Sequence, residues 1–143
     1  MAGVLASQGR DALVFSSDDG LDELAGTSPA RVWEVRGGLV THTNLDPVED
    51  LGVAPITIAD LRGGEARENA GIARRVFSGT PGPVRDTVIL NAAAGLVADG
   101  TLPGTGHGTL SERIAVGMTL AADAIDDGRA TDVLDRWVAA SNA

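Results

Sequence analysis

A four-residue apolar run near the N-terminus, Ala12-Leu13-Val14-Phe15, constrains the fold of this chain more than any other feature. Turn-forming residues flank it, and a short run that is apolar at every position is typical of a strand buried on both faces of its sheet. The other strand candidates are Arg31–Val35 and Leu39–Thr43, whose Arg36-Gly37-Gly38 link predicts a hairpin. A polar hairpin cannot bury such a strand alone, so we expect further strands of its sheet to lie outside this chain.

Helical patterns dominate the rest of the sequence. Residues 1–8 have an apolar helical face that ends at Gly9, and residues 44–55, with two prolines and several acids, are predicted to form a loop. An amphipathic helix is predicted over residues 65–78, and a helix that is apolar almost all round, typical of a core helix, over residues 84–98.

Two further helices complete the C-terminal part. Thr109 and Glu112 have the spacing of a capping box, which predicts the start of a helix. The last helix is predicted to bury a stripe formed by Val133, Leu134, Trp137 and Val138. We therefore predict an α/β fold in which a partial central sheet with a hairpin is followed by about four C-terminal helices.

Composition narrows the classes of partner. The 143 residues carry a formal net charge of −9, and all 11 basic residues are arginine, so we do not expect nucleic acid as a partner. There is no cysteine, which excludes disulfides and thiolate chemistry and fits a reducing cytoplasm. No apolar run reaches the roughly 18 residues of a membrane span, and the first residues lack the pattern of a signal peptide, so we expect no membrane association.

An acidic turn, residues 16–23, is the strongest chemical signal. It follows the apolar strand at its carboxyl end, where open α/β sheets place their ligands. Its adjacent carboxylates, Asp22 and Glu23, could hold Mg²⁺, which takes one or two carboxylates and completes its shell with water and phosphate oxygens. A purely structural role is the alternative, because acidic residues also gather in turns and at helix N-termini.

Other candidate sites are weaker. Arg62-Gly63-Gly64 could bind an anion before a helix, but a glycine turn is the simpler interpretation. His42 and His107 have no second ligand or nucleophile at a suitable spacing, so we expect structural or exposed positions. Asn69 and Asn91 lie on apolar helical faces, where buried hydrogen bonding is expected.

The combination of motifs resembles the C-terminal portion of the anthranilate phosphoribosyltransferase family. Each motif alone is weak, but together they occur in the family's order and spacing over essentially the whole chain. The matching segments are Ala12–Phe15, Asp18–Leu24, Asp60–Gly64, Glu68–Ala70, Gly82–Asp86, Leu90–Ala94, Ala124–Gly128 and Trp137–Val138.

The resemblance implies a nucleoside phosphorylase/phosphoribosyltransferase-type α/β domain. Residues 1–143 would form its C-terminal part, without the N-terminal helical domain and the first half of the α/β domain. It further implies that Asp22 and Glu23 ligate Mg²⁺, with no acid–base role, and that the glycines at 63 and 64 are structural. The family's glycine-rich pyrophosphate loop and its Lys-, Ser-, Asn- and Arg-bearing substrate segments have no counterpart in the sequence.

By this resemblance the complete enzyme transfers the phosphoribosyl group of phosphoribosyl pyrophosphate to anthranilate, releases pyrophosphate, and forms a homodimer through the missing domain. We expect this chain to be inactive alone. Two alternatives remain: an inactive truncated or split product that acts as an interaction module through its unpaired sheet edge, and a related phosphoribosyltransferase or phosphorylase with another acceptor.

Overall fold

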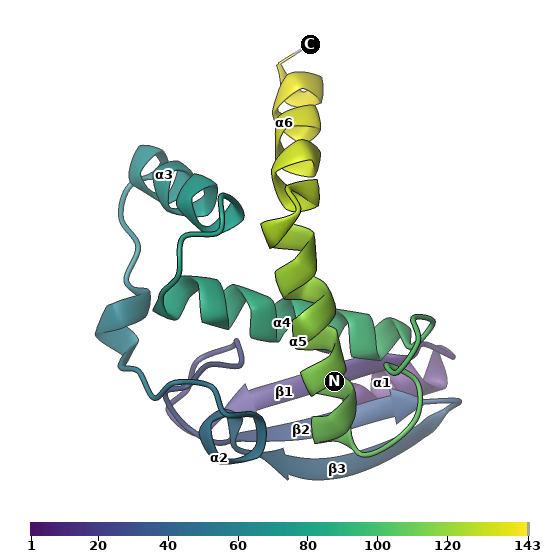
Figure 1. Cartoon of the computed structure of the whole chain (residues 1–143). Helices are drawn as coiled ribbons and strands as arrows, with labels where there is room; N and C mark the ends of the chain where they lie inside the picture. The colour runs from purple at the N-terminus through teal and green to yellow at the C-terminus, as the bar shows by residue number, and fades with distance from the viewer. Residues whose placement is uncertain (143) are drawn as a thin grey trace.

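A computed structural model describes residues 1–142 and has the predicted α/β architecture (Figure 1). One short helix precedes a three-stranded sheet, and four longer helices form the C-terminal part of the chain. In chain order the elements are α1 (Ala2–Ser7), β1 (Ala12–Ser17), β2 (Ala30–Arg36), β3 (Leu39–Leu45), α2 (Pro47–Leu51), the 3₁₀ helix η1 (Ile58–Leu61), α3 (Ala66–Phe77), α4 (Pro83–Asp99), α5 (Leu110–Asp126) and α6 (Arg129–Ser141). No helix within residues 1–142 is long and apolar enough to cross a membrane.

One predicted loop contains a helix. The short helix α2 lies inside residues 44–55 and begins at Asp46, whose carboxylate accepts hydrogen bonds from the backbone N–H groups of Val48 and Glu49. Pro47 occupies the first helical position, where a missing N–H costs nothing. The loop prediction was wrong here because proline and acidic residues signal a helix start as well as a loop.

The sheet is antiparallel with the order β1-β2-β3, and β2 and β3 form the predicted hairpin. Phe15 pairs with Val32, and Val32 pairs with Thr43. The prediction that the first strand is buried on both faces was wrong for the chain described here, because residues 12–16 are half-buried. Within residues 1–142, β1 has β2 as its one neighbouring strand, so strands beyond its other edge remain an expectation.

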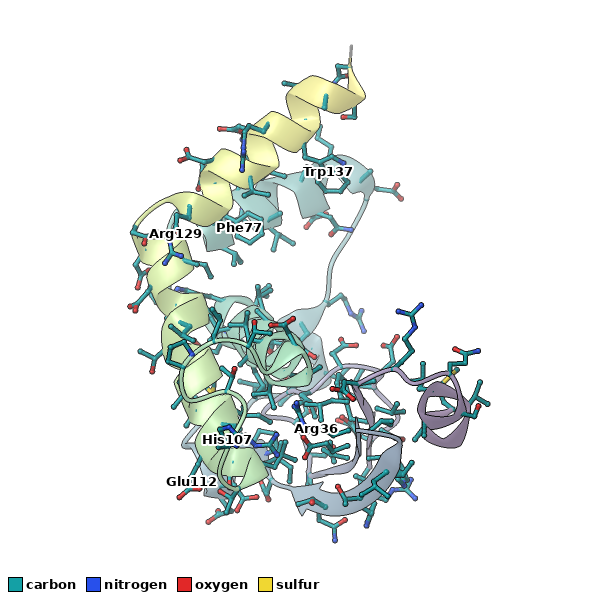
Figure 2. All side chains as sticks on the ribbon, turned by 90° about the vertical axis from the view of Figure 1, so that its right-hand side faces the viewer. Arg36, Phe77, His107, Glu112, Arg129 and Trp137 are labelled. Atoms are coloured by element: carbon teal, nitrogen blue, oxygen red, sulfur yellow. The ribbon has the colours of Figure 1, made fainter. Side chains whose placement is uncertain are left out.

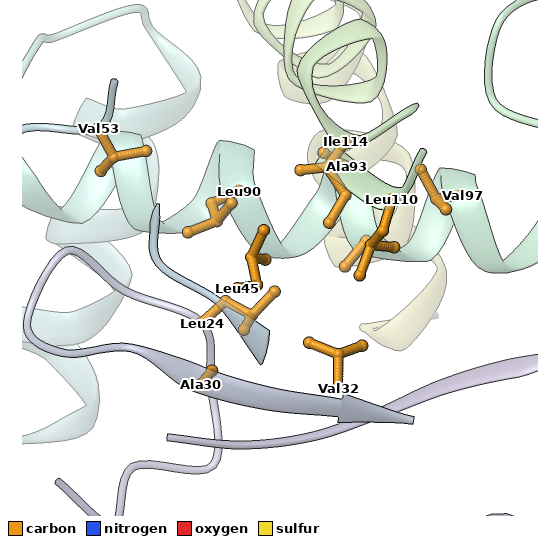
Figure 3. Close-up of a cluster of buried hydrophobic side chains, with 11 residues drawn as sticks. Leu24, Ala30, Val32, Leu45, Val53, Leu90, Ala93, Val97, Leu110 and Ile114 are labelled. Atoms are coloured by element: carbon orange, nitrogen blue, oxygen red, sulfur yellow. The ribbon is translucent and has the colours of Figure 1, made fainter. Parts of the chain in front are cut away.

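The main core lies between the sheet and helices α4 and α5 (Figure 3). A second cluster joins α3 to the far side of α4 and α5 and includes Val76, Ile89 and Ile125. Because α4 contributes buried side chains to both clusters, it needs apolar residues around most of its circumference. This confirms the core helix predicted over residues 84–98.

The predicted buried stripe of the last helix was wrong. Helix α6 extends away from the sheet (Figure 1), and Val133 and Trp137 are 55% and 71% exposed. Figure 2 shows Trp137 on α6, well away from the sheet. The helical period of the sequence identified the apolar stripe, but a sequence pattern does not specify which element packs against it.

Helices α4 and α5 cross at a glycine. A Cβ atom on Gly117 would lie 3.0 Å from the Cα, Cβ and carbonyl oxygen atoms of Ala93, so the two backbones could not keep their present separation. We expect Gly117→Ala to lower the free energy of unfolding by about 1–3 kcal/mol through overpacking, measured by urea denaturation.

Gly95 is the matched control because it is also helical, yet a Cβ there would meet nothing within 4 Å. Gly95→Ala should raise the free energy of unfolding by up to about 1 kcal/mol through helix propensity. Equal effects of the two substitutions would contradict the close helix crossing.

Candidate functional site

The acidic turn is closed against the end of β1 by hydrogen bonds to Ser17, the last residue of the strand. The Ser17 hydroxyl donates a hydrogen bond to the carbonyl oxygen of Glu23 at 2.8 Å. Ser17 is buried, with only 3% of the residue exposed. The Ser17 carbonyl accepts a hydrogen bond from the N–H of Gly20, whose positive φ of 88° allows the tight reversal. The turn therefore has a defined course and returns to the strand that it leaves.

Helix α4 holds the other end of the turn. The side-chain amide of Asn91 accepts a hydrogen bond from the Leu24 N–H at 3.0 Å and donates to the Leu24 carbonyl at 2.7 Å. It also donates to the Thr87 carbonyl at 2.8 Å. Leu24 itself is buried in the main core, at 1% exposure. The hydrogen-bonding role predicted for Asn91 is thus confirmed.

The two predicted ligand residues lie between these anchors. Asp22 is exposed and Glu23 is half-buried. The pKa of Glu23 is raised above its ordinary value, first because the Asp22 carboxyl group lies beside it, and then because of partial burial. The structure thus places two carboxylates close together at the carboxyl end of β1.

This donor set fits Mg²⁺ in one respect. Within the described residues there is no cluster of three or more His, Cys, Asp or Glu side chains that could form a metal site by itself. Two carboxylates are nevertheless what Mg²⁺ takes from a protein when water and substrate phosphates supply its other ligands. A pair of this kind suits a hard cation whose other ligands come from water and a phosphorylated molecule, and it is unlike a closed structural zinc site.

The remaining candidates have structural positions. His42 is exposed on β3 and lies against Trp33, with ring centroids 5.3 Å apart, and His107 is exposed in the loop between α4 and α5. The burial predicted for Asn69 was wrong, because the residue is exposed, but its side chain does form hydrogen bonds: it accepts from the N–H and donates to the carbonyl of Gly64, both at 2.8 Å. A Cβ atom on Gly63 would lie 2.6 Å from the Asn69 Oδ1 atom, so a larger residue there would displace the Asn69 side chain.

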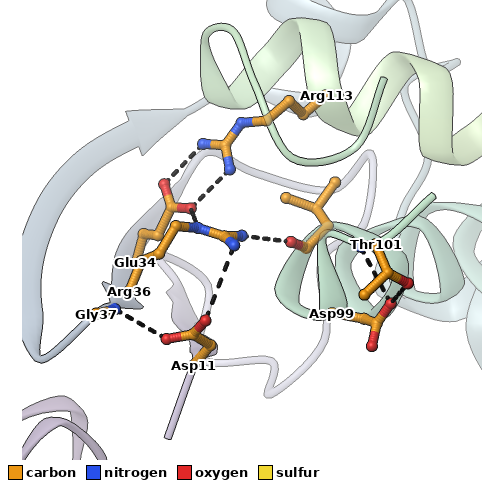
Figure 4. A network of polar contacts seen from close by, with 8 residues as sticks. Asp11, Glu34, Arg36, Gly37, Asp99, Thr101 and Arg113 are labelled. Carbon is orange, nitrogen blue, oxygen red and sulfur yellow. Dashed lines mark hydrogen bonds and ion pairs between the residues drawn. The ribbon is translucent and has the colours of Figure 1, made fainter. Parts of the chain in front are cut away.

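A partly buried ion pair links the sheet to the helices and was missed from the sequence (Figure 4). The guanidinium of Arg113 on α5 donates to both carboxylate oxygens of Glu34 on β2, at 2.6 and 2.7 Å. Arg36 donates to Glu34 at 3.1 Å and to the Val97 carbonyl at 2.8 Å. The hydrogen bonds from Arg113 hold the pKa of Glu34 below its ordinary value. A usable sequence signal was the position of Arg113 three residues after Leu110 and four before Gly117, a helical spacing that places it on the buried face of α5.

The fold agrees with comparisons to known proteins. Residues 1–131 match the family model described as "Glycosyl transferase family, a/b domain", and the chain belongs to this family.

The relatives within it are anthranilate phosphoribosyltransferases, as the sequence motifs predicted. The enzyme of Streptomyces avermitilis is 52% identical over 143 residues, which is all of this chain and 39% of that relative. The enzyme of Arthrobacter sp. is 50% identical over 139 residues, covering 97% of this chain and 38% of the relative. The chain thus spans about two fifths of the length of the curated relatives that it matches.

Solved structures support the phosphoribosyltransferase-type fold. The crystal structure of anthranilate phosphoribosyltransferase from Thermus thermophilus matches with a TM-score of 0.81 and 34% identity, over 99% of this chain and 39% of that one. The Saccharomyces cerevisiae enzyme, solved in complex with PRPP and Mg, matches with a TM-score of 0.73 and 21% identity, over 87% of this chain and 33% of that one. The yeast comparison shows the shared fold.

Proposed function

We propose that the chain is part of an anthranilate phosphoribosyltransferase, which transfers the phosphoribosyl group of phosphoribosyl pyrophosphate to the amine of anthranilate in tryptophan biosynthesis. The observation that carries this proposal is the identity of 52% along the entire chain with a relative of that name. The match is not confined to one motif: it runs through the acidic turn, α4 and the C-terminal helices. This argues against a chance likeness of a single loop.

In this proposal, residues 1–143 are the C-terminal part of the phosphoribosyltransferase α/β domain. The segment that the relatives have in addition would supply an N-terminal helical domain, the first half of the α/β domain and the homodimer contact. Its strands would extend the sheet beyond β1, whose second edge has no strand beside it within residues 1–142. The complete enzyme would be cytoplasmic and would need neither nucleic acid nor a membrane.

The proposed chemistry is the exchange of one bond at C1 of the ribose for another. The C1–O bond to pyrophosphate breaks, the amine nitrogen of anthranilate bonds to C1, and the amine loses a proton. Asp22 and Glu23 would hold Mg²⁺, which when bound would neutralise negative charge on the departing pyrophosphate. The chain's own contribution is to keep these two carboxylates together at the end of β1, while the missing segment would hold anthranilate and the phosphates.

A reconstitution experiment tests the proposal. Loss of anthranilate fluorescence is followed with phosphoribosyl pyrophosphate and Mg²⁺, using the chain alone and then mixed with the remaining N-terminal segment of the S. avermitilis relative. We expect no turnover by the chain alone and Mg²⁺-dependent turnover by the mixture, because the two parts together form one site.

Three results would contradict the proposal. Turnover by the chain alone would mean that the substrate-binding groups are already present in it. No turnover by a mixture that forms a complex in sedimentation, with the chain folded by circular dichroism, would favour an interaction module instead. Turnover with another aromatic or nucleobase acceptor in place of anthranilate would identify a related transferase.

A further inference from the structure

We propose that Asn91 is a positioning residue for the magnesium site, acting through the peptide group that joins Glu23 to Leu24. This inference rests on the proposed function, since it concerns the same two carboxylates. Asn91 lies 67 residues from Leu24 in the sequence and reaches it from α4. It touches neither carboxylate in its hydrogen bonds, so its effect must pass through the backbone.

Both polar ends of one peptide group are held by side chains. The carbonyl oxygen of Glu23 accepts from the Ser17 hydroxyl at 2.8 Å, and the N–H of the next residue, Leu24, donates to the Asn91 side chain at 3.0 Å. Ser17 belongs to β1 and Asn91 to α4, so the peptide plane is fixed relative to both elements. A fixed peptide plane restricts the direction in which the Glu23 side chain leaves the backbone.

The amide of Asn91 is itself held in one orientation. Its nitrogen donates to the Leu24 carbonyl at 2.7 Å and to the Thr87 carbonyl at 2.8 Å, which uses both of its N–H groups. The oxygen is therefore the atom that faces the Leu24 N–H. An alanine would provide none of these three hydrogen bonds, and the segment after Glu23 would lose its link to α4.

The chain contains a matched control for this arrangement. Asn69 on α3 forms the same pair of hydrogen bonds with a single residue, Gly64, both at 2.8 Å. Gly64 precedes α3 and is far along the chain from the acidic turn. Asn69→Ala therefore removes an equivalent pair of backbone hydrogen bonds without loosening the Glu23–Leu24 peptide.

The test is a titration of the ¹⁵N-labelled full chain with Mg²⁺, followed by amide chemical shifts. We expect Mg²⁺-dependent shifts in residues 19–24 of the unaltered chain, with about tenfold weaker affinity in Asn91→Ala, as is common when groups behind a metal ligand are removed. Asn69→Ala should bind Mg²⁺ as tightly as the unaltered chain. Ser17→Ala is a smaller change and should also weaken Mg²⁺ binding, by a factor of about three to ten. This variant provides the test if Asn91→Ala does not fold.

The outcomes separate the two proposals. Unchanged Mg²⁺ affinity in folded Asn91→Ala and in Ser17→Ala would overturn the positioning role and leave the metal site intact. Equal weakening by Asn69→Ala would also overturn it, because a general loss of rigidity would then explain the result. Absence of any Mg²⁺-dependent shift in the unaltered chain, while the reconstituted enzyme turns over, would overturn a preformed site in this chain and leave the proposed activity standing.

Discussion

Replacing Arg113 with methionine is expected to lower the free energy of unfolding by about 2–3 kcal/mol, because it leaves the half-buried Glu34 carboxylate without its main partner. The Arg113 residue is only 5% exposed, and the pair is bidentate. Methionine keeps the apolar stem of the side chain, so the loss reports mainly the charge and its hydrogen bonds. Urea denaturation followed by circular dichroism measures the effect.

The control for Arg113→Met is Arg74→Met, which breaks the ion pair of Arg74 with Asp135. These side chains are 55% and 58% exposed and 3.2 Å apart, so the expected change is below about 1 kcal/mol. A loss of under about 1 kcal/mol for Arg113→Met would show that the pair between β2 and α5 does not stabilise the fold. The double variant Arg113→Met with Glu34→Gln should recover part of the loss, because it removes the unpaired charge.

The same pair makes stability depend on pH in a definite direction. The folded-state pKa of Glu34 lies below its unfolded value, first because of the hydrogen bonds from Arg113. Its contribution is therefore fully present above the unfolded pKa and is lost as the pH falls through the folded pKa. Arg113→Met should reduce this acid-dependent loss relative to the unaltered chain, and parallel curves of stability against pH would argue against the assignment.

The double substitution Asp22→Asn with Glu23→Gln is expected to lower turnover of the reconstituted enzyme by about 10²–10³-fold at saturating Mg²⁺. Both amides keep the size of the side chains and remove their charge. Because the pKa of Glu23 is raised by its neighbour Asp22, the folded state disfavours its charged form, so neutralisation should not reduce the stability of the chain. Lost activity with unchanged thermal unfolding is the expected pair of results.

The control for the double substitution lies in the same turn. Asp18 is exposed and lies 3.9 Å from Arg31. Asp18→Asn removes a charge from the turn but no proposed ligand, and it should change turnover less than about threefold, as expected for a screened surface charge. Near-normal turnover of the double variant would remove Asp22 and Glu23 from the metal site.

Local signals predicted the elements well. The hairpin of β2 and β3 followed from the β-branched runs around Gly37 and Gly38, and the capping box of Thr109 and Glu112 marked the first turn of α5 correctly. These signals need only residues that are close in the sequence. The prediction failed where an element depends on its surroundings: the apolar stripe of α6 lacks a covering element in the described chain, and β1 has one neighbouring strand.

The same distinction between local signals and long-range packing holds for the residues of the candidate site. Asp22 and Glu23 could be found because they are adjacent in sequence and follow a recognisable strand. The link between Leu24 and Asn91 spans 67 residues, and the pair of Glu34 with Arg113 spans 79. Such partners are brought together by the packing of α4 and α5 on the sheet, and no periodicity within a single element specifies them.

Helix α4 also determines how the molecule can lose its structure. It supplies Leu90 and Val97 to the cluster on the sheet and Ile89 to the cluster under α3, and Met118 of α5 packs against both. Neither cluster can unfold without exposing part of the other, so α4 couples the two clusters into one cooperative unit. Helix α6, none of whose described residues is buried, packs Ala130 against the second cluster, and its later turns can fray without disturbing either one.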